Sequence, residues 1–339
     1  FAARFPNAVV GLVTLLTFFY LGKRLIDTRF GFLWALAYLG SVTPHLYFKS
    51  GIIDPLFNYF MFLSVVNLLP ASLLGKEEAK SNESIRFFLA GLFAGLAVWT
   101  KGPVGVGVPT LTLAAFWTVN YLGTKTNAFA LKNILIYTLT AGLFTLGWMA
   151  AIIWESGWAT FVAFLEYLYR LGATSEADHG QPFYYHFVVV LLGCFPISVL
   201  GLPYVSQIFN PIFRRFQRKT GDIPSPKFEV TNPDADKQCK VPDALQYDSS
   251  TLKISSFTLM MLCLFWVVMI VFSIVKTKIV HYSSMTYFPL SFLAALWLYR
   301  WLKGEIVWPR WMTVVLLIIG FILSLVLAAV PWIGMNASM

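Results

Sequence analysis

The sequence predicts an all-α protein that crosses a membrane many times, and three observations lead to this fold class. Of the 339 residues, 58% are hydrophobic and only 12% are charged, and the mean hydropathy is +0.70; soluble domains carry roughly a quarter of charged residues. Apolar runs close to the ~20 residues that a helix needs to cross a bilayer recur along the whole chain. Lys and Arg gather in alternate loops, which is expected when successive spans reverse direction.

We expect ten membrane spans. Two of them, residues 55–70 and 87–99, are short and reach spanning length only with flanking residues or in a locally thinner bilayer. The ten spans cover residues 5–22, 30–48, 55–70, 87–99, 103–122, 134–154, 184–207, 255–275, 282–299 and 311–331.

The distribution of positive charge predicts the orientation. If the loops alternate sides, nineteen of the 25 Lys and Arg residues lie on one side, which the positive-inside rule makes cytoplasmic. The net charge of +9 is then a topology signal, and no nucleic-acid partner is needed to account for it. Asp54 lies on the outer side, together with the six remaining cations: Arg4, Lys49, Lys101, Arg170, Lys276 and Lys278.

The chain divides into three parts. Residues 1–207 form transmembrane helices with external loops that carry the candidate site, residues 208–253 form a polar, proline-containing cytoplasmic linker, and residues 254–339 form the C-terminal transmembrane helices. Because the chain starts outside without a signal peptide, we expect at least one further span and an external segment upstream of residue 1. The three Cys residues show no disulfide framework and no metal-type spacing.

Asp54 is the first candidate functional residue. It has about ten mostly apolar residues on either side, and an acid at the end of a span is costly unless it is paired or hydrated. Lys49, five residues earlier, is close enough in sequence to pair with it. The alternative is an acid at the lipid headgroups that only starts the next helix, since Asp followed by Pro favours a helix N-terminus.

Lys101 lies in the tightest external turn, between two apolar segments and directly before Gly102 and Pro103. As a snorkelling lysine it would contact lipid phosphate. Because positive charge is scarce on this side, we favour a cation that holds an anionic head group in a cavity.

The external loop 155–183 begins with an amphipathic stretch, residues 158–170, that is expected to lie in the interface plane. Glu166 and Arg170 are four residues apart on this stretch and could pair or face a ligand together. Residues 172–180 are polar and typical of a lid. Tyr184 and Tyr185 follow, and they either contact substrate or belong to an aromatic belt.

The last external turn carries Lys276, Lys278, His281 and Tyr282, which crowd hydrogen-bonding groups where water and headgroups meet. Elsewhere, the sequence contains no phosphate-binding P-loop, no metalloprotease motif and no nucleophile elbow, and cytosolic ATP chemistry is not expected. No inverted repeat is visible, which argues against a secondary transporter.

Five collinear motifs resemble the GT-C integral membrane glycosyltransferases, above all the aminoarabinose transferases of lipid A and the bacterial enzymes related to protein mannosyltransferases. The resemblance covers essentially the whole chain. It lies in residues 53–55, 99–103, 166–170, 179–185 and 272–278 with Tyr282.

This resemblance implies a GT-C type helix bundle that transfers a sugar, with inversion, from a polyprenyl phosphate to a glycolipid such as lipid A, or to a protein. The site would face the periplasm or outside of the inner membrane. Asp54 would be the second acid of the active site, and donor phosphate would be held by Lys101, Arg170, Lys278 and Tyr282. Further candidate substrate contacts are Glu166, Tyr184, Tyr185 and Lys276.

The resemblance also places the principal catalytic Asp, in an external Asp-Glu pair, upstream of residue 1, so that this chain alone would be inactive. No nucleotide cofactor is implied. A divalent metal is left open, because some aminoarabinose transferases bind one through a His where this sequence has Tyr167. The alternative function class is a carrier or flippase for polyprenyl-linked or other anionic lipids, which would use the same external cations without chemistry.

Overall fold

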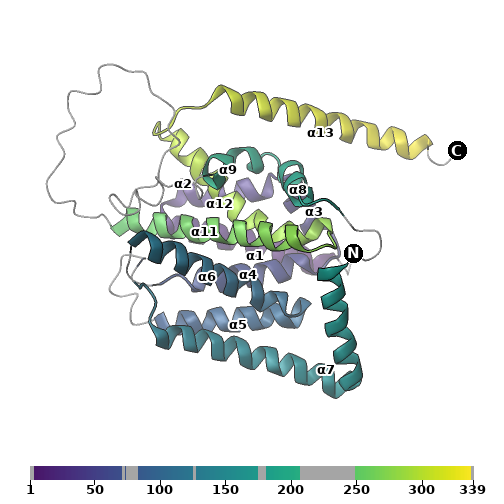
Figure 1. Cartoon of the computed structure of the whole chain (residues 1–339). Coiled ribbons are helices and arrows are strands. Elements are labelled where there is room, and N and C mark those ends of the chain that lie inside the picture. The colour runs from purple at the N-terminus through teal and green to yellow at the C-terminus, as the bar shows by residue number, and fades with distance from the viewer. Residues whose placement is uncertain are drawn as a thin grey trace.

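The computed structural model describes residues 4–70, 73, 83–124, 127–174, 181–206 and 249–336, and the predicted all-α architecture is confirmed in them. The regular elements in these described ranges are thirteen helical segments (Figure 1). In chain order they are α1 (Phe5–Leu25), α2 (Thr28–Leu39), α3 (Val42–Lys49), α4 (Asp54–Asn67), α5 (Glu83–Lys101), α6 (Val104–Thr124), α7 (Leu131–Ala173), α8 (Tyr185–Gly193), α9 (Ile197–Val205), α11 (Ser249–Ile274), the 3₁₀ helix η5 (Val280–Thr286), α12 (Tyr287–Leu302) and α13 (Arg310–Asn336).

Helices occupy all ten predicted spans, but three of these spans are not single α-helices. The second is divided at Gly40 and Ser41 into α2 and α3, and the seventh is divided into α8 and α9. The ninth begins with the 3₁₀ helix η5 and continues as α12. Within the described ranges, five helices are both long and apolar enough to cross a membrane: those of α1, α5, α7, α11 and α13.

Small residues let α5 and α7 approach each other closely. A Cβ atom added to Gly91 would lie 2.7 Å from the Cβ of Thr140, and one added to Gly95 would lie 2.3 Å from the Cβ of Phe144. Helix pairs in membranes associate through such close packing, since lipid tails provide no hydrophobic drive for their association. The two glycines therefore set the distance between α5, which ends at Lys101, and the long helix α7.

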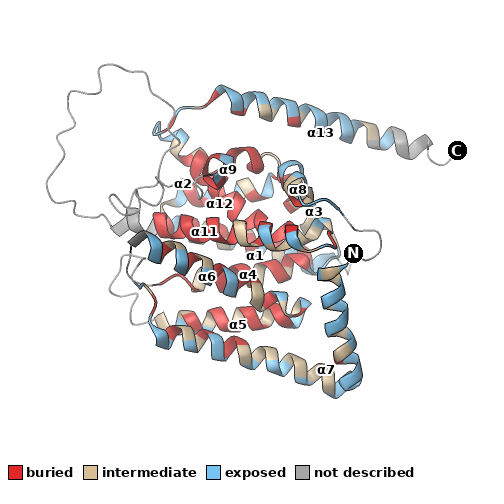
Figure 2. Ribbon diagram, in the orientation of Figure 1, coloured by how far each residue is buried: buried red, intermediate tan, exposed pale blue. Residues whose placement is uncertain are grey.

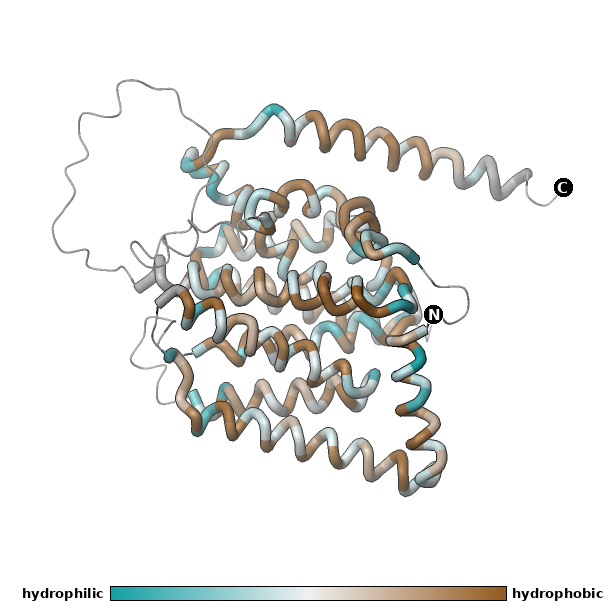
Figure 3. Tube along the Cα trace, viewed as in Figure 1, coloured by the Kyte–Doolittle hydropathy of each residue, from teal (hydrophilic) through white to brown (hydrophobic). Residues whose placement is uncertain are grey.

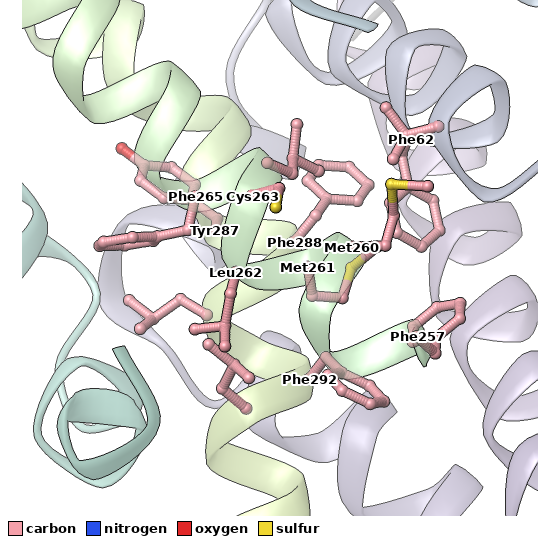
Figure 4. Packing of buried hydrophobic residues seen from close by; sticks show 14 of the residues in the cluster. Phe62, Phe257, Met260, Met261, Leu262, Cys263, Phe265, Tyr287, Phe288 and Phe292 are labelled. Atoms are coloured by element: carbon pink, nitrogen blue, oxygen red, sulfur yellow. The ribbon is translucent and has the colours of Figure 1, made fainter. Parts of the chain in front are cut away.

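Aromatic side chains form the centre of the bundle. The rings of Phe18 and Trp34 stack with centroids 4.7 Å apart, and Phe62 and Phe288 pack edge-on against Phe18. The Trp34 indole donates a hydrogen bond of 3.1 Å to Ser291, so its polar atom is satisfied inside the bundle. Figure 4 shows Phe62 of α4 and Phe288 of α12 in this cluster. The cluster fixes α4 against α12, and each of these helices adjoins a segment of the site described below.

The exposed surface of α13 is largely apolar. Helix α13 is mostly exposed in Figure 2, yet Figure 3 colours most of its described part as hydrophobic. Exposed apolar side chains on it include Leu317, Phe321 and Leu325. Apolar helices with exposed apolar surface are typical of lipid-facing segments, and the protein is thus a multi-pass membrane protein.

Helix α7 turns sharply at Gly157, where φ is +84° and the regular helix is interrupted. Glycine adopts this left-handed conformation without the strain that a Cβ atom brings. Beyond the turn, the second half of α7 runs across the ends of the neighbouring helices (Figure 1). A helix is therefore present over residues 158–170, where an external amphipathic helix was expected, and it follows the first part of α7 across the kink at Gly157.

Candidate active site

A cavity of about 330 Å³ lies where six helical segments meet: the start of α4, the end of α5, the start of α6, the second half of α7, the end of α11 and η5. Apolar side chains make up most of its wall, and a few polar groups converge on it, as is typical of ligand sites. The lining residues are Asp54, Phe57, Asn58, Met61, Lys101, Val104, Phe164, Tyr167, Leu168, Leu171, Gly172, Phe272, Val275, His281, Tyr282 and Met285.

Asp54 and Lys101 form an ion pair in this cavity. The Lys101 ammonium donates to Asp54 Oδ1 over 2.6 Å, and the side chains are 30% and 7% exposed respectively. The Lys101 nitrogen also lies 5.8 Å from the centroid of the Phe57 ring. The expectation that Lys49 pairs with Asp54 was wrong, since the partner comes from the end of α5 instead. A buried carboxylate requires such a partner, because desolvation disfavours an isolated charge.

Local structure places both charges. Asp54 is the first residue of α4 and precedes Pro55, which suits a first helical turn. The segment before it is held by the Asn7 side chain, which donates hydrogen bonds of 2.7 and 2.6 Å to the carbonyl groups of Ser50 and Ile52. Lys101 ends α5, and Gly102 reverses the chain with a φ of +88°. A tight turn of this kind requires glycine.

A chain of hydrogen bonds joins α4 to η5 at the cavity. The Asn58 amide donates to Ser284 Oγ over 2.7 Å, and Ser284 Oγ donates to the carbonyl of His281 over 2.6 Å. Asn58 and Ser284 are buried. Neither residue was predicted from the sequence. Asn58 follows Asp54 by four positions, and this spacing, which places two helical residues on one face, was the available signal.

His281 and Tyr282 contribute the η5 wall. Burial lowers the pKa of His281 below its usual range; the nearby Asp54 carboxylate opposes this shift and the Lys101 ammonium adds to it. His281 is therefore neutral at pH 7. The Tyr282 ring packs against Phe272 of α11, with centroids 5.5 Å apart. Of the four polar residues expected to act together in the last turn, these two reach the cavity.

The other predicted cations lie elsewhere. Lys278 is buried, and its ammonium donates a 2.8 Å hydrogen bond to the carbonyl of Val275. Lys276 is exposed, and its backbone N–H donates to the carbonyl of Gly172 over 3.3 Å. Arg170 of α7 is exposed and is not among the cavity-lining residues.

The remaining candidate contacts are also outside the cavity wall. Glu166 is exposed on α7, one residue before Tyr167, which does line the cavity. Tyr184 is 62% exposed where α8 begins, and Tyr185 is half-buried. The predicted lid, residues 172–180, is described only as far as residue 174.

The end of α7 is tied to the segment between α11 and η5. Thr277 donates from its backbone to the carbonyl of Leu171 over 3.3 Å and from its hydroxyl to the carbonyl of Thr174 over 2.9 Å. Leu168, Leu171 and Gly172 at this end line the cavity. These bonds fix the roof of the cavity against its η5 wall.

Within the described ranges, no group of three His, Cys, Asp or Glu side chains is close enough to hold a metal ion. Tyr167 occupies the cavity wall where the resemblance suggested a His ligand. A phenol is a poor ligand for the divalent metals in question compared with imidazole. The described residues therefore do not fit a resident metal, and the chemistry below uses none.

No family model matches the chain, whereas several curated proteins do. It is 25% identical over 299 residues to the undecaprenyl phosphate-alpha-4-amino-4-deoxy-L-arabinose arabinosyl transferase of Aeromonas hydrophila, which is 87% of this chain and 46% of that protein. It is also 25% identical over 199 residues to the corresponding transferase of Edwardsiella ictaluri, which is 58% of this chain and 34% of that protein. The chain thus spans between a third and a half of the length of these relatives.

Solved structures of an aminoarabinose transferase have a similar fold. ArnT from Cupriavidus metallidurans in the apo state superposes with a TM-score of 0.65 at 17% identity, over 97% of this chain and 50% of that one. The same protein bound to undecaprenyl phosphate gives a TM-score of 0.62 at 16% identity, over 98% and 51%. The resemblance drawn from the motifs is confirmed: the chain is similar in sequence to the aminoarabinose transferases, and its fold is the GT-C fold of about half of an ArnT chain.

Proposed function

We propose that the complete protein is an inverting glycosyltransferase that takes a sugar from a polyprenyl-phosphate donor. The acceptor is lipid A, another glycolipid or a protein, at the periplasmic or outer face of the inner membrane. One observation carries the proposal: the Lys101–Asp54 ion pair lies in a largely apolar cavity at one end of a transmembrane bundle. Such a cavity suits a ligand that combines an apolar chain with an anionic group. The relatives' activity and the undecaprenyl phosphate in one ArnT structure support it.

In the proposed reaction, the acceptor oxygen attacks the anomeric carbon as the bond to the donor phosphate oxygen breaks. The electron pair of that bond stays on the phosphate, whose negative charge grows in the transition state. Lys101 offsets this charge in a cavity where few waters compete, and Asp54 holds the ammonium in place. The second Asp54 carboxylate oxygen accepts no hydrogen bond from the described residues and is available to the sugar or acceptor.

Further contacts follow from the segments that bound the cavity. Tyr282 lines it directly and is proposed to hydrogen-bond the donor phosphate. Arg170 and Lys278 lie on the two segments joined by Thr277, and we propose that they contact the phosphate once donor is bound. Glu166, Tyr184, Tyr185 and Lys276 are proposed as contacts of the sugar or acceptor at the cavity rim.

Purified complete protein tests the proposal with two separate measurements, namely binding of undecaprenyl phosphate and transfer of labelled sugar. We expect Asp54→Asn to lower transfer and leave donor binding largely intact. Lys101→Ala should weaken donor binding by about 30-fold, which corresponds to the loss of about 2 kcal/mol from one charge-assisted hydrogen bond. Arg170→Ala should weaken it as well.

Lys132→Ala is the matched control, since this exposed lysine lies at the far end of α7. It should leave binding and transfer unchanged. Donor binding without formation of any glycosidic bond would refute the transferase and favour a lipid carrier or flippase. Mass spectrometry of lipid A and glycoproteins from a deletion strain then identifies the acceptor and the sugar.

A further inference from the structure

We propose that Asn58 is a specificity-determining residue, whose side-chain oxygen accepts a hydrogen bond from a hydroxyl or amine group of the donor sugar. This inference rests on the proposed glycosyl transfer and deepens it, because it states which kind of group the sugar must carry at one position. The roles proposed above for Asp54 and Lys101 are unchanged.

The first argument is position. Asn58 lines the cavity and follows Asp54 by four residues in α4. Side chains with this spacing lie on one face of a helix, with Cβ atoms about 5–6 Å apart. The sugar of a polyprenyl-phosphate donor is joined directly to the phosphate. A phosphate at Lys101, which is paired with Asp54, therefore brings the sugar to the part of the wall that contains Asn58.

The second argument is the direction of the hydrogen bonds that hold the Asn58 amide. The carbonyl oxygen of His281 can only accept, so the 2.6 Å bond to it uses the single hydroxyl proton of Ser284. Ser284 Oγ can then only accept from Asn58, over 2.7 Å, and the Asn58 atom that faces it must be Nδ2. Because the amide orientation is fixed in this way, Oδ1 is the atom that remains for a ligand. Ser284 is thus a positioning residue that acts through Asn58.

The third argument is that this oxygen is unpaired and can be reached by a ligand. Among the described residues, Ser284 is the hydrogen-bond partner of the Asn58 side chain, and Oδ1 has none. Asn58 is only 4% exposed, yet Oδ1 is not among the described side-chain atoms that are both enclosed and without a partner. The oxygen is therefore open to the cavity. Since an amide oxygen only accepts, the ligand group that pairs with it must be a donor, such as a hydroxyl, an amine or an ammonium.

The apolar surroundings make this acceptor selective. Met61 of α4 and Met285 of η5 are buried and line the same cavity, and neither side chain offers a hydrogen-bond donor. A buried acceptor that a ligand leaves unpaired weakens binding about 5- to 150-fold, which corresponds to about 1–3 kcal/mol. Sites that pair with a substrate hydroxyl discriminate strongly against analogues that lack it. Asn58 therefore selects a sugar with a donor group at one position rather than sugars in general.

A panel of donors tests the proposal with the complete protein. The parent is undecaprenyl phosphate-linked 4-amino-4-deoxy-L-arabinose, the donor of the aminoarabinose transferases, and each analogue lacks its amine or one of its hydroxyl groups. In the wild type, loss of the group that pairs with Asn58 should lower kcat/KM about 5- to 150-fold. Asn58→Leu, a change that nearly keeps the size of the side chain, should transfer the parent less well by the same factor and no longer prefer it over that analogue.

Two further variants separate this effect from a structural one. Ser284→Ala should reduce the preference, because the Asn58 amide can then turn its nitrogen toward the ligand. Asn67→Leu is the matched control, since this asparagine ends the same helix, lies outside the cavity wall and donates to the carbonyl of Leu63. It should keep the wild-type preference.

Thermal unfolding shows that each variant is folded. An Asn58→Leu variant with the wild-type preference among the donors, or a wild type that uses the parent and all analogues equally well, overturns this inference and leaves the proposed function intact. If Asn58→Leu does not fold, Ser284→Ala decides, and an unchanged preference overturns the inference. If the wild type transfers neither these sugars nor the sugar that is missing from the deletion strain, the proposed function is overturned and this inference with it.

Discussion

Replacing Lys101 and replacing Asp54 should lower the stability of the protein by different amounts, and a double-mutant cycle can measure how strongly the two side chains interact. Two unit charges 2.6 Å apart attract by about 6 kcal/mol at an effective dielectric constant of about 20. Desolvation cancels much of this, and the partly exposed Lys101 side chain is screened by solvent. A net coupling of about 2 kcal/mol remains, as for a hydrogen bond between charged groups.

Lys101→Met should destabilise the protein more than Asp54→Asn. The Met variant leaves a carboxylate that is 7% exposed without its cation, whereas the Asn variant leaves an ammonium that is 30% exposed and can hydrate. In the double variant, the destabilisation should be less than the sum of the two single effects by the coupling energy. Unfolding in mixed micelles with increasing SDS measures each variant, and Lys132→Met serves as the control. A coupling below about 0.5 kcal/mol, which is the usual error of additivity, would refute a functional ion pair.

Three further predictions concern stability and positioning. Burial opposes ionisation of Asp27, but the hydrogen bonds that its carboxylate accepts from the Tyr299 hydroxyl and from backbone N–H groups hold its pKa below 3.8. The ionised Asp27 therefore stabilises the fold above pH 3.8, and this contribution is lost as the pH falls through the lowered pKa. Tyr299→Phe should weaken this acid dependence of the melting temperature in thermal melts. Gly105→Ala places a Cβ atom 2.6 Å from the α5 backbone and should lower the free energy of unfolding by about 1–3 kcal/mol. Gly107→Ala is the control, since no atom lies within 4 Å of its added Cβ and its stability should not fall measurably. Equal melting temperatures of the two variants would contradict the packing of α5 on α6. Asn7→Ala removes two hydrogen bonds from the segment before α4 and should lower kcat more than donor affinity, and a loss confined to affinity would show that the segment does not position Asp54.

The sequence predicted a helix at each of the ten expected spans, because hydrophobicity and length mark segments that can cross a bilayer; within the described ranges, five helices are long and apolar enough to do so. The sequence also predicted that Lys101 lies at a cavity. The prediction was possible because a turn of only a few residues between two apolar segments keeps its lysine at the ends of the helices. The breaks inside three spans were missed. At Gly40 and Ser41, for instance, α2 ends and α3 begins; Gly40 and Pro44 were the available signals of a helix end, but the surrounding hydrophobic residues led to the prediction of one span.

The cavity wall was predicted less well because sequence proximity does not determine the direction of a side chain. Lys278 and Tyr282 were expected to act together, yet Tyr282 lines the cavity while Lys278 binds the carbonyl of Val275. Lys49 is five residues from Asp54, but the actual partner is 47 residues away. Contacts between distant helices depend on packing, such as the glycine contacts of α5, which local spacing does not reveal.

The kink in α7 has a consequence for the geometry of the cavity. One half of this helix packs along α5 inside the membrane, and the other half supplies Leu168 and Leu171 to the roof of the cavity. Gly157 is the one break in the helical conformation between them, and no atom outside its immediate chain neighbours lies within 4 Å of where its Cβ would be. The part of α7 that packs on α5 and the part that forms the roof are therefore joined through a single residue of non-helical conformation. The size of the cavity depends in this way on the angle that the chain adopts at Gly157.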